Sequence, residues 1–96
     1  MHGVIRMYSG SGAKKLFDLV EERKNEVEGL MRGVKGFVSY SAMRTADGGA
    51  SVTVCQDKAG TDESMQIARD WIAKNASNLG ASPPTVLEGS VLLQLK

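Results

Sequence analysis

An Asp-Gly turn between two strand-like segments is the strongest constraint that this sequence places on its fold. Residues 36–45 (GFVSYSAMRT) and 50–57 (ASVTVCQD) both have the composition and alternation of β-strands, and ADGG lies between them. Asp-Gly is the common signal for a tight hairpin turn, because its central residues need positive φ angles. We therefore predict that these two strands pair antiparallel.

Helix and strand patterns flank this hairpin on both sides. Residues 2–8 alternate like a strand, and from Ala13 to about Arg32 apolar residues recur at helical spacing around the solvated run EERKNE. Thr61 is the predicted N-cap of a second helix, which ends in the breaker sequence NLGASPP, and residues 86–95 predict a last strand. The order βαββαβ predicts an α+β, ferredoxin-like fold. It has a four-stranded antiparallel sheet with both helices on one face, in a single domain over residues 1–96.

Charge and composition limit the possible partners. Twelve Lys and Arg balance eleven Asp and Glu, so the net charge of +1 offers no basic field for a nucleic-acid backbone. The sequence has no run of about 18 apolar residues that would suggest a membrane span. Its one cysteine can form no internal disulfide, as suits a reducing compartment. We therefore expect a cytoplasmic protein that binds neither nucleic acid nor membrane.

The two faces of the expected sheet differ in character. One face is almost wholly apolar, and we predict that it lies under the helices: Ile5, Met7, Val38, Tyr40, Val52, Val54, Val91, Leu93 and Leu95. The other face mixes small hydroxyl and apolar side chains with a single charge, Arg6, whereas a water-facing sheet usually carries more charge. The simplest cover is a second copy of the chain, in a homodimer that uses one patch twice. The candidates for this dimer face are Phe37, Ser39, Ser41, Ser51, Thr53, Cys55 and Leu92.

Cys55 and His2 are the one Cys/His pair of the sequence. Free cysteine is most often a small buried side chain, so we interpret Cys55 as an interfacial residue and not as a nucleophile. Zinc in proteins usually has about four ligands, and one His and one Cys cannot supply them. The residues therefore predict no metal site, and no cofactor is expected.

Tyr40, Trp71 and Asn75 are the candidates for a ligand pocket. Trp71 and Asn75 are one helical turn apart and share a helix face, and Tyr40 is predicted to point at the helices. A phenol, an indole N–H and an amide at the edge of an apolar space could orient a small molecule by hydrogen bonds. The alternative is that Tyr40 and Trp71 only fill the core. Arg44, near the end of its strand, either faces an anionic substrate or solubilises the hairpin.

Two long segments, VKGFVSYSAMRTADGG and SVTVCQDKAGTDESMQIARDWIAKNAS, resemble the antibiotic biosynthesis monooxygenase-like (ABM) superfamily of dimeric α+β barrels. In that family a Gly-Phe opens the second strand after the first helix, an Asp-Gly hairpin follows, and a strand end leads into a Ser-containing helix start. The resemblance covers nearly the whole chain. It implies a homodimer whose sheets pack into a barrel, in agreement with the argument from the sheet faces.

The resemblance also implies an activity. Monooxygenases of this superfamily need no metal or flavin: they hold a phenolic or quinol-like substrate between helix and sheet, favour its deprotonation and let the carbanion meet oxygen. By residue type, Tyr40, Trp71 and Asn75 would orient such a small aromatic molecule here. Haem-degrading relatives use a helix histidine as axial ligand, and the second helix here has none. A non-catalytic dimer that binds a small ligand or serves assembly also fits the resemblance, so both functions stay open.

Overall fold

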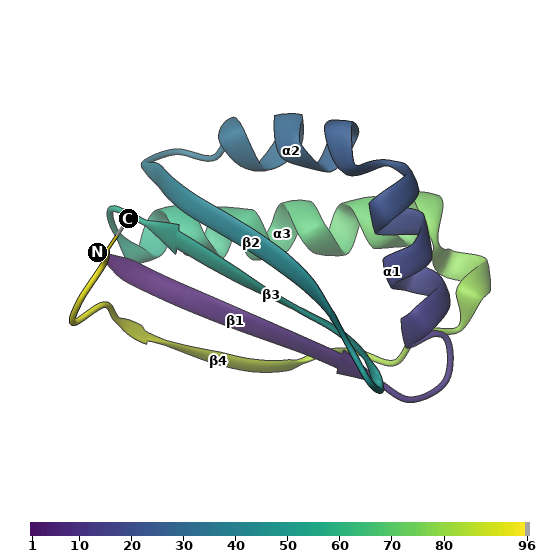
Figure 1. Cartoon of the computed structure of the whole chain (residues 1–96). Coiled ribbons are helices and arrows are strands. Elements are labelled where there is room, and N and C mark those ends of the chain that lie inside the picture. Colours follow the sequence, from purple (N-terminus) through teal and green to yellow (C-terminus); the bar gives the residue numbers. More distant parts are fainter. Residues whose placement is uncertain (96) are drawn as a thin grey trace.

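The computed structural model describes residues 1–95, and its centre is a four-stranded antiparallel sheet in the order β2-β3-β1-β4. Its helices lie on one side of the sheet (Figure 1). The predicted ferredoxin-like α+β fold is confirmed. The strands are β1 (His2–Ser9), β2 (Phe37–Thr45), β3 (Gly48–Cys55) and β4 (Thr85–Ser90).

The first predicted helix is divided into two in the structure. α1 (Ala13–Glu22) and α2 (Lys24–Arg32) meet at Arg23, whose φ of −110° and ψ of 30° are not helical. The bend falls within the polar run EERKNE, which carries no apolar side chain to hold a straight helix against the sheet. It turns α2 away from the direction of α1, so that α2 runs along the top of the layer (Figure 1).

The second predicted helix, α3 (Lys58–Asn75), begins earlier than expected. Its N-cap is Asp57, whose side chain accepts a hydrogen bond from the backbone N–H of Gly60 at 3.2 Å. Thr61 instead lies inside the helix, fully buried. A short 3-10 helix, Ser77–Leu79, follows α3 and leads to β4. None of the helices within residues 1–95 has the length and apolar character of a bilayer-spanning segment.

The face of the sheet that we expected to meet a second subunit lies, in β1 and β3, under the helices. Val4, Arg6 and Tyr8 of β1 lie buried beneath the helices, and so do the three alternate residues of β3: Ser51, Thr53 and Cys55. The apolar face, with Ile5 and Met7 of β1 and Val52 of β3, is the open one. The assignment of faces in β1 and β3 is therefore wrong. Alternation separates two faces of a strand, but it does not say which of them a helix covers.

An irregularity in β2 adds to the difference. The register of β2 against β3 shifts between Phe37 and Ser39, as at a β-bulge. Phe37 and Tyr40 consequently both face the helices, where they pack against the core. Ser39 and Ser41 remain on the open face, opposite Val54 and Val52 of β3.

Phe17 of α1 fixes the helix layer over one end of the sheet. Its ring meets that of Tyr8 edge to face, with centroids 5.7 Å apart and an interplanar angle of 62°. Gly49 of β3 makes room for it, because a Cβ there would lie 2.4 Å from two atoms of the Phe17 ring. Leu16, Met31 and other buried residues of the three helices complete the core.

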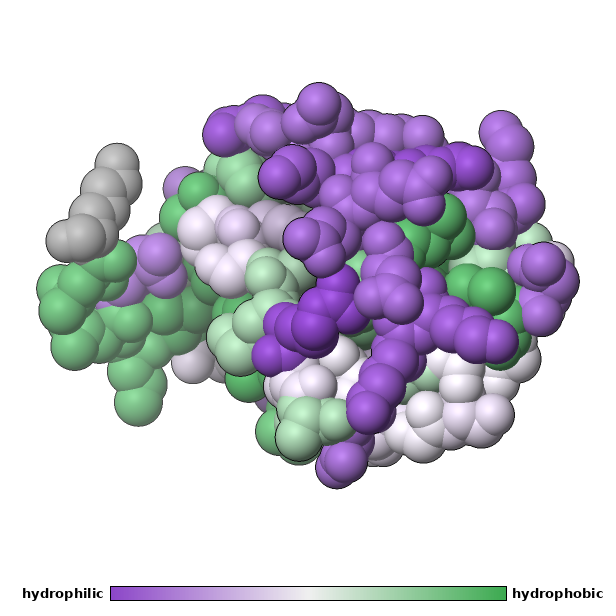
Figure 2. Space-filling view, turned by 45° about the vertical axis from the view of Figure 1, so that its right-hand side comes forward, coloured by the Kyte–Doolittle hydropathy of each residue, from purple (hydrophilic) through white to green (hydrophobic). Residues whose placement is uncertain are grey.

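The last predicted strand, residues 86–95, ends early in the structure. β4 stops at Ser90, and residues 91–95 continue outside the sheet. The backbone N–H of Val91 still donates to the carbonyl of Met1 at 2.9 Å, but beyond it Leu92 is 97% exposed. Figure 2 shows an apolar mass projecting from the body at the C-terminal end.

Candidate functional site

A pocket lies between the helix layer and the covered face of the sheet. The unfilled space at its centre measures about 40 Å³, and the whole hollow with its open mouth about 470 Å³. Its walls are mostly apolar, as is usual for small-molecule sites. The lining residues come from β1, β2, β3 and all three α-helices: Arg6, Tyr8, Leu16, Phe17, Val20, Val27, Leu30, Met31, Tyr40, Ser51, Ile67, Ala68, Trp71 and Ile72.

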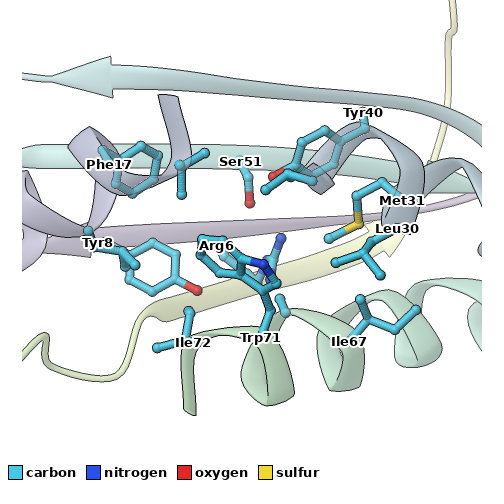
Figure 3. A pocket seen from close by; sticks show the side chains of 14 residues that line it. Arg6, Tyr8, Phe17, Leu30, Met31, Tyr40, Ser51, Ile67, Trp71 and Ile72 are labelled. Carbon is cyan, nitrogen blue, oxygen red and sulfur yellow. The ribbon is translucent and has the colours of Figure 1, made fainter. Parts of the chain in front are cut away.

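Two neighbouring polar side chains, Arg6 and Ser51, form the floor of this pocket. They are direct partners in the antiparallel pairing of β1 with β3, so they lie side by side on the covered face. Arg6 is 4% exposed and Ser51 3% exposed. Neither Arg6 Nε nor Ser51 Oγ has a hydrogen-bond partner among residues 1–95. The hydroxyls of Tyr8, Tyr40 and Ser51 point toward the centre of the pocket, near Arg6 (Figure 3).

Arg6 brings a positive charge to the covered face of the sheet, where its guanidinium is hydrogen-bonded to the Tyr8 hydroxyl. No ion pair joins Arg6 to a carboxylate in the part of the chain that the structure describes. Burial raises the pKa of the Tyr8 hydroxyl, and the positive charge of Arg6 opposes that shift. Arg6 is a site residue that the sequence analysis missed. It was visible as the single charge on its face, but that face was expected to meet a second subunit.

Tyr40 and Trp71 are both among the residues that line the pocket. The indole N–H of Trp71 already has a partner, since it donates to Glu26 Oε2 of α2 at 2.6 Å. This hydrogen bond joins α3 to α2, and α2 covers the pocket with its side chains Leu30 and Met31. Trp71 therefore offers the pocket its aromatic face, while its hydrogen-bond donor faces α2.

Asn75 and Arg44 do not line the pocket. Asn75 Oδ1 accepts from Arg23 at 2.8 Å, and its Nδ2 donates to the carbonyl of Trp71 at 3.0 Å. Arg44 lies on the exposed end of β2, where its guanidinium binds Asp18 and Glu21 of α1 at 2.7 and 2.6 Å. Both side chains join secondary-structure elements and are engaged in the free subunit.

His2 and Cys55 are cross-strand partners, but they do not form a reactive pair. His2 Nδ1 is hydrogen-bonded to Thr61 Oγ1 at 2.8 Å, and His2 Nε2 lies 3.6 Å from Glu88. Burial raises the pKa of the Cys55 thiol, and the carboxylates of Asp57 and Glu63 add to the shift. Within residues 1–95, no three His, Cys, Asp or Glu side chains are grouped so that they could hold a metal ion.

Cys55 is therefore expected to be inert toward thiol reagents in the folded protein. Its reaction with Ellman's reagent should be on the order of 100-fold slower than in the unfolded chain, because the buried thiol is both inaccessible and un-ionised. Absorbance at 412 nm measures the rate in buffer and in guanidinium chloride. A cysteine placed at exposed Ser82 in a Cys55→Ala background is the control and should react at once. Fast labelling of native Cys55 would contradict its buried position.

Comparison with protein-family models and with curated proteins gives no match to this sequence. Solved structures do match, at low sequence identity. A protein of unknown function from Nitrosomonas europaea, NE2512, has a TM-score of 0.71 and 18% identity over 99% of this chain and 91% of its own. A dimeric ferredoxin-like protein from an uncultured marine organism has a TM-score of 0.64 and 10% identity, covering 99% of this chain and 95% of that one.

The ActVA-Orf6 monooxygenase of Streptomyces coelicolor, solved in complex with the ligand nanaomycin D, is a third match. Its TM-score is 0.57 and its identity 20%, with 97% of this chain and 91% of that chain covered. These identities establish the shared fold and leave the activity to be argued from the site. The chain thus has the ferredoxin-like α+β fold that ABM-type monooxygenases and dimeric ferredoxin-like proteins share.

Proposed function

We propose that the protein is a homodimeric, cofactor-independent monooxygenase that acts on a small phenolic or other aromatic molecule. The observation that carries this proposal is the apolar pocket between helices and sheet, whose walls include the rings of Tyr8, Tyr40 and Trp71. Aromatic walls suit a flat aromatic substrate, which they contact by stacked or edge-to-face packing. The proposal is also supported by the similar fold of the Streptomyces coelicolor monooxygenase, which was crystallised with a ligand.

The chemistry needs only the substrate and dioxygen. A phenol that loses its hydroxyl proton carries negative charge on ring carbons, and one such carbon donates an electron pair to O₂ to form a C–O bond. Proton uptake gives a hydroperoxide, which loses water as its O–O bond breaks and leaves a ring carbonyl. The substrate loses two hydrogens and gains one oxygen, and the second oxygen leaves as water. The apolar walls keep bulk water from the intermediate.

The open face of the sheet is the proposed dimer interface. Ser41, Val52, Ile5 and Leu87 form one row across the four strands, and the neighbouring row contains Met43, Ala50 and Met7. Leu87 is 54% exposed and Met43 is 53% exposed, although both are apolar. Such a continuous apolar sheet face requires cover. A second copy supplies it by symmetric packing, in keeping with the dimeric protein of the same fold.

A second candidate function is a non-catalytic dimer that binds a small ligand. It is favoured by the absence of an evident base, since no carboxylate or imidazole lines the pocket within residues 1–95. The raised pKa of Tyr8 also keeps that hydroxyl protonated and therefore unsuited to accept a proton at neutral pH. In this alternative the same pocket holds its ligand without turnover.

Oxygen consumption with 1-naphthol distinguishes the two functions. We expect chelator-treated protein to consume one O₂ for each quinone formed, measured with an oxygen electrode and by absorbance. An Ile67→Trp variant, which replaces a lining aliphatic side chain with a bulkier indole, should lose this activity while keeping its helical circular dichroism. Saturable binding of 1-naphthol without oxygen uptake would support the non-catalytic dimer. Absence of both binding and uptake would overturn both functions.

A further inference from the structure

We propose that the floor of the pocket, Arg6 and Ser51, is a binding site for the charged oxygen of a small apolar anion such as an aromatic phenolate or carboxylate. This inference rests on the proposed function for the position of the ligand. It goes further by assigning the ligand a negative charge and by naming the two residues that receive it.

The first argument is the environment of Arg6. Arg6 as a whole residue is only 4% exposed, and an arginine buried to this extent normally has a carboxylate partner, because an isolated buried charge is very unfavourable. Arg6 has no such partner among residues 1–95, and its Nε makes no hydrogen bond there. Inside the subunit its guanidinium is hydrogen-bonded to the neutral Tyr8 hydroxyl, and most of the remaining pocket wall is apolar, so no negative charge faces it there within the described residues. An anionic ligand would complete the site.

The second argument is the arrangement of donors. Arg6 presents a planar fork of N–H groups, which matches the oxygens of a carboxylate or a phenolate, and Ser51 adds a hydroxyl from the adjacent strand. Figure 3 shows the hydroxyls of Tyr8 and Tyr40 directed at the same space. The central void of about 40 Å³ exceeds the roughly 10–15 Å³ that one water requires, so it has room for a small polar group. The apolar walls then contact the ring.

The third argument concerns the other titratable groups around this space. Tyr8 from β1 and Tyr40 from β2 are the ionisable side chains that line the pocket besides Arg6 within the described residues. The helices contribute apolar side chains and Trp71. The nearby carboxylate of Glu26 accepts from the Trp71 indole and is ion-paired with Arg23 at 3.8 Å, and the positive charge of Arg69 also acts on Tyr8. Arg6 is thus the one formally charged side chain lining the pocket within the described residues, and such a charge favours an anion over its neutral counterpart.

Paired probes of equal shape test the charge selection. Benzoate is expected to raise the melting temperature of the wild-type protein and to bind at least about tenfold more tightly than benzamide in calorimetry, because charge-assisted hydrogen bonds are the stronger ones. In an Arg6→Met variant both probes should bind equally weakly. Arg32→Met makes the same chemical change on the exposed surface of α2 and should retain the wild-type preference. Equal affinity of benzoate and benzamide for the wild type would overturn the proposal.

A chromogenic phenol tests the same site by a signal that depends on charge. The pKa of bound 4-nitrophenol, followed by its phenolate absorbance, should fall by about one unit or more beside the Arg6 guanidinium. In Arg6→Met the guanidinium charge is gone and only burial and the neutral hydroxyl donors act on the phenol, so its bound pKa should lie clearly above its value in the wild-type protein. A bound pKa that is the same in both proteins would contradict the role of Arg6.

Stability separates a binding role of Arg6 from a structural one. Without ligand, Arg6→Met should melt at the same or a higher temperature than the wild type, because it removes an uncompensated buried charge. A variant that fails to fold would show that Arg6 is structural and would count against the proposal.

The binding probes also separate this inference from the proposed oxygenase activity. Anion-selective binding without oxygen uptake would support the anion site and contradict the proposed oxygenase activity. Oxygen uptake with no preference for anions would contradict the anion site and support the oxygenase activity.

Discussion

If the wild type forms the proposed dimer, an Ile5→Lys variant is expected to be a folded monomer at the same concentration. Ile5 lies at the centre of the open sheet face, paired with Val52 on one side and Leu87 on the other. In the free subunit a lysine there would extend into water, so folding is little affected. In a symmetric dimer it would bury two ammonium groups without partners, which weakens association by about 3 kcal/mol or more, or about 100-fold.

Sedimentation velocity measures this effect directly, because the monomer and the dimer sediment as separate species. Gln66→Lys is the matched control: it adds the same charge on the exposed side of α3, away from the open face, and should remain dimeric. Circular dichroism at the same concentrations checks that both variants are folded. An Ile5→Lys protein that sediments as the wild type does would place the dimer interface elsewhere.

Gly60→Ala and Gly29→Ala are expected to change stability in opposite directions, although both place alanine inside a helix. Alanine is favoured over glycine in helices by about 1 kcal/mol, and Gly29 of α2 has open space around it, so that variant should gain about 0.5–1 kcal/mol. A Cβ at Gly60 of α3 would lie 2.4 Å from the carbonyl oxygen of Lys35 and 2.7 Å from the Cβ of Cys55. The backbone of Lys35 cannot move away without disturbing its neighbours, so Gly60→Ala is expected to lower the free energy of unfolding by about 1–3 kcal/mol.

Urea denaturation of the two variants and the wild type checks this pair of results. The midpoint should rise for Gly29→Ala and fall for Gly60→Ala, with similar slopes. Because the proposed dimer would couple folding to association, the three proteins are compared at one concentration. A stabilising Gly60→Ala would mean that α3 does not approach Lys35 as closely as the structure describes.

The local features of the fold could be read from the sequence. The hairpin between β2 and β3, the helical spacing of residues 13–32 and the breaker sequence after α3 each depend on neighbouring residues alone. Together they gave the βαββαβ order and hence the ferredoxin-like fold. The turn itself differs from the expected Asp-Gly turn: Ala46 and Asp47 lie between the strands, Gly48 already pairs with Thr45, and Asp47 does not have a positive φ. Tyr40 and Trp71 were also placed along the helix–sheet pocket, because the bulge in β2 kept Tyr40 on the side that its pattern suggested.

The features that the sequence could not decide depend on contacts between distant segments. Arg6, Ser51 and Thr53 alternate with Ile5 and Val52, and alternation defines two faces without saying which one the helices cover. The more apolar face was therefore assigned to the helices, whereas the structure leaves that face open. Asn75 and Arg44 have the residue types of a binding site, but both are used within the fold. Asn75 accepts a hydrogen bond from Arg23, at the end of α1, and Arg44 binds the carboxylates of Asp18 and Glu21 in α1.

The sequence by itself thus determined the order of the elements, because turns and helical or strand periodicity arise from interactions between residues close in the chain. Only the tertiary structure decided that Arg6 is enclosed beneath the helices beside Ser51, and that the apolar face is exposed. The reason is physical: burial and charge compensation depend on which segments pack against one another, and the same alternating strand satisfies its local preferences with either face toward the helices.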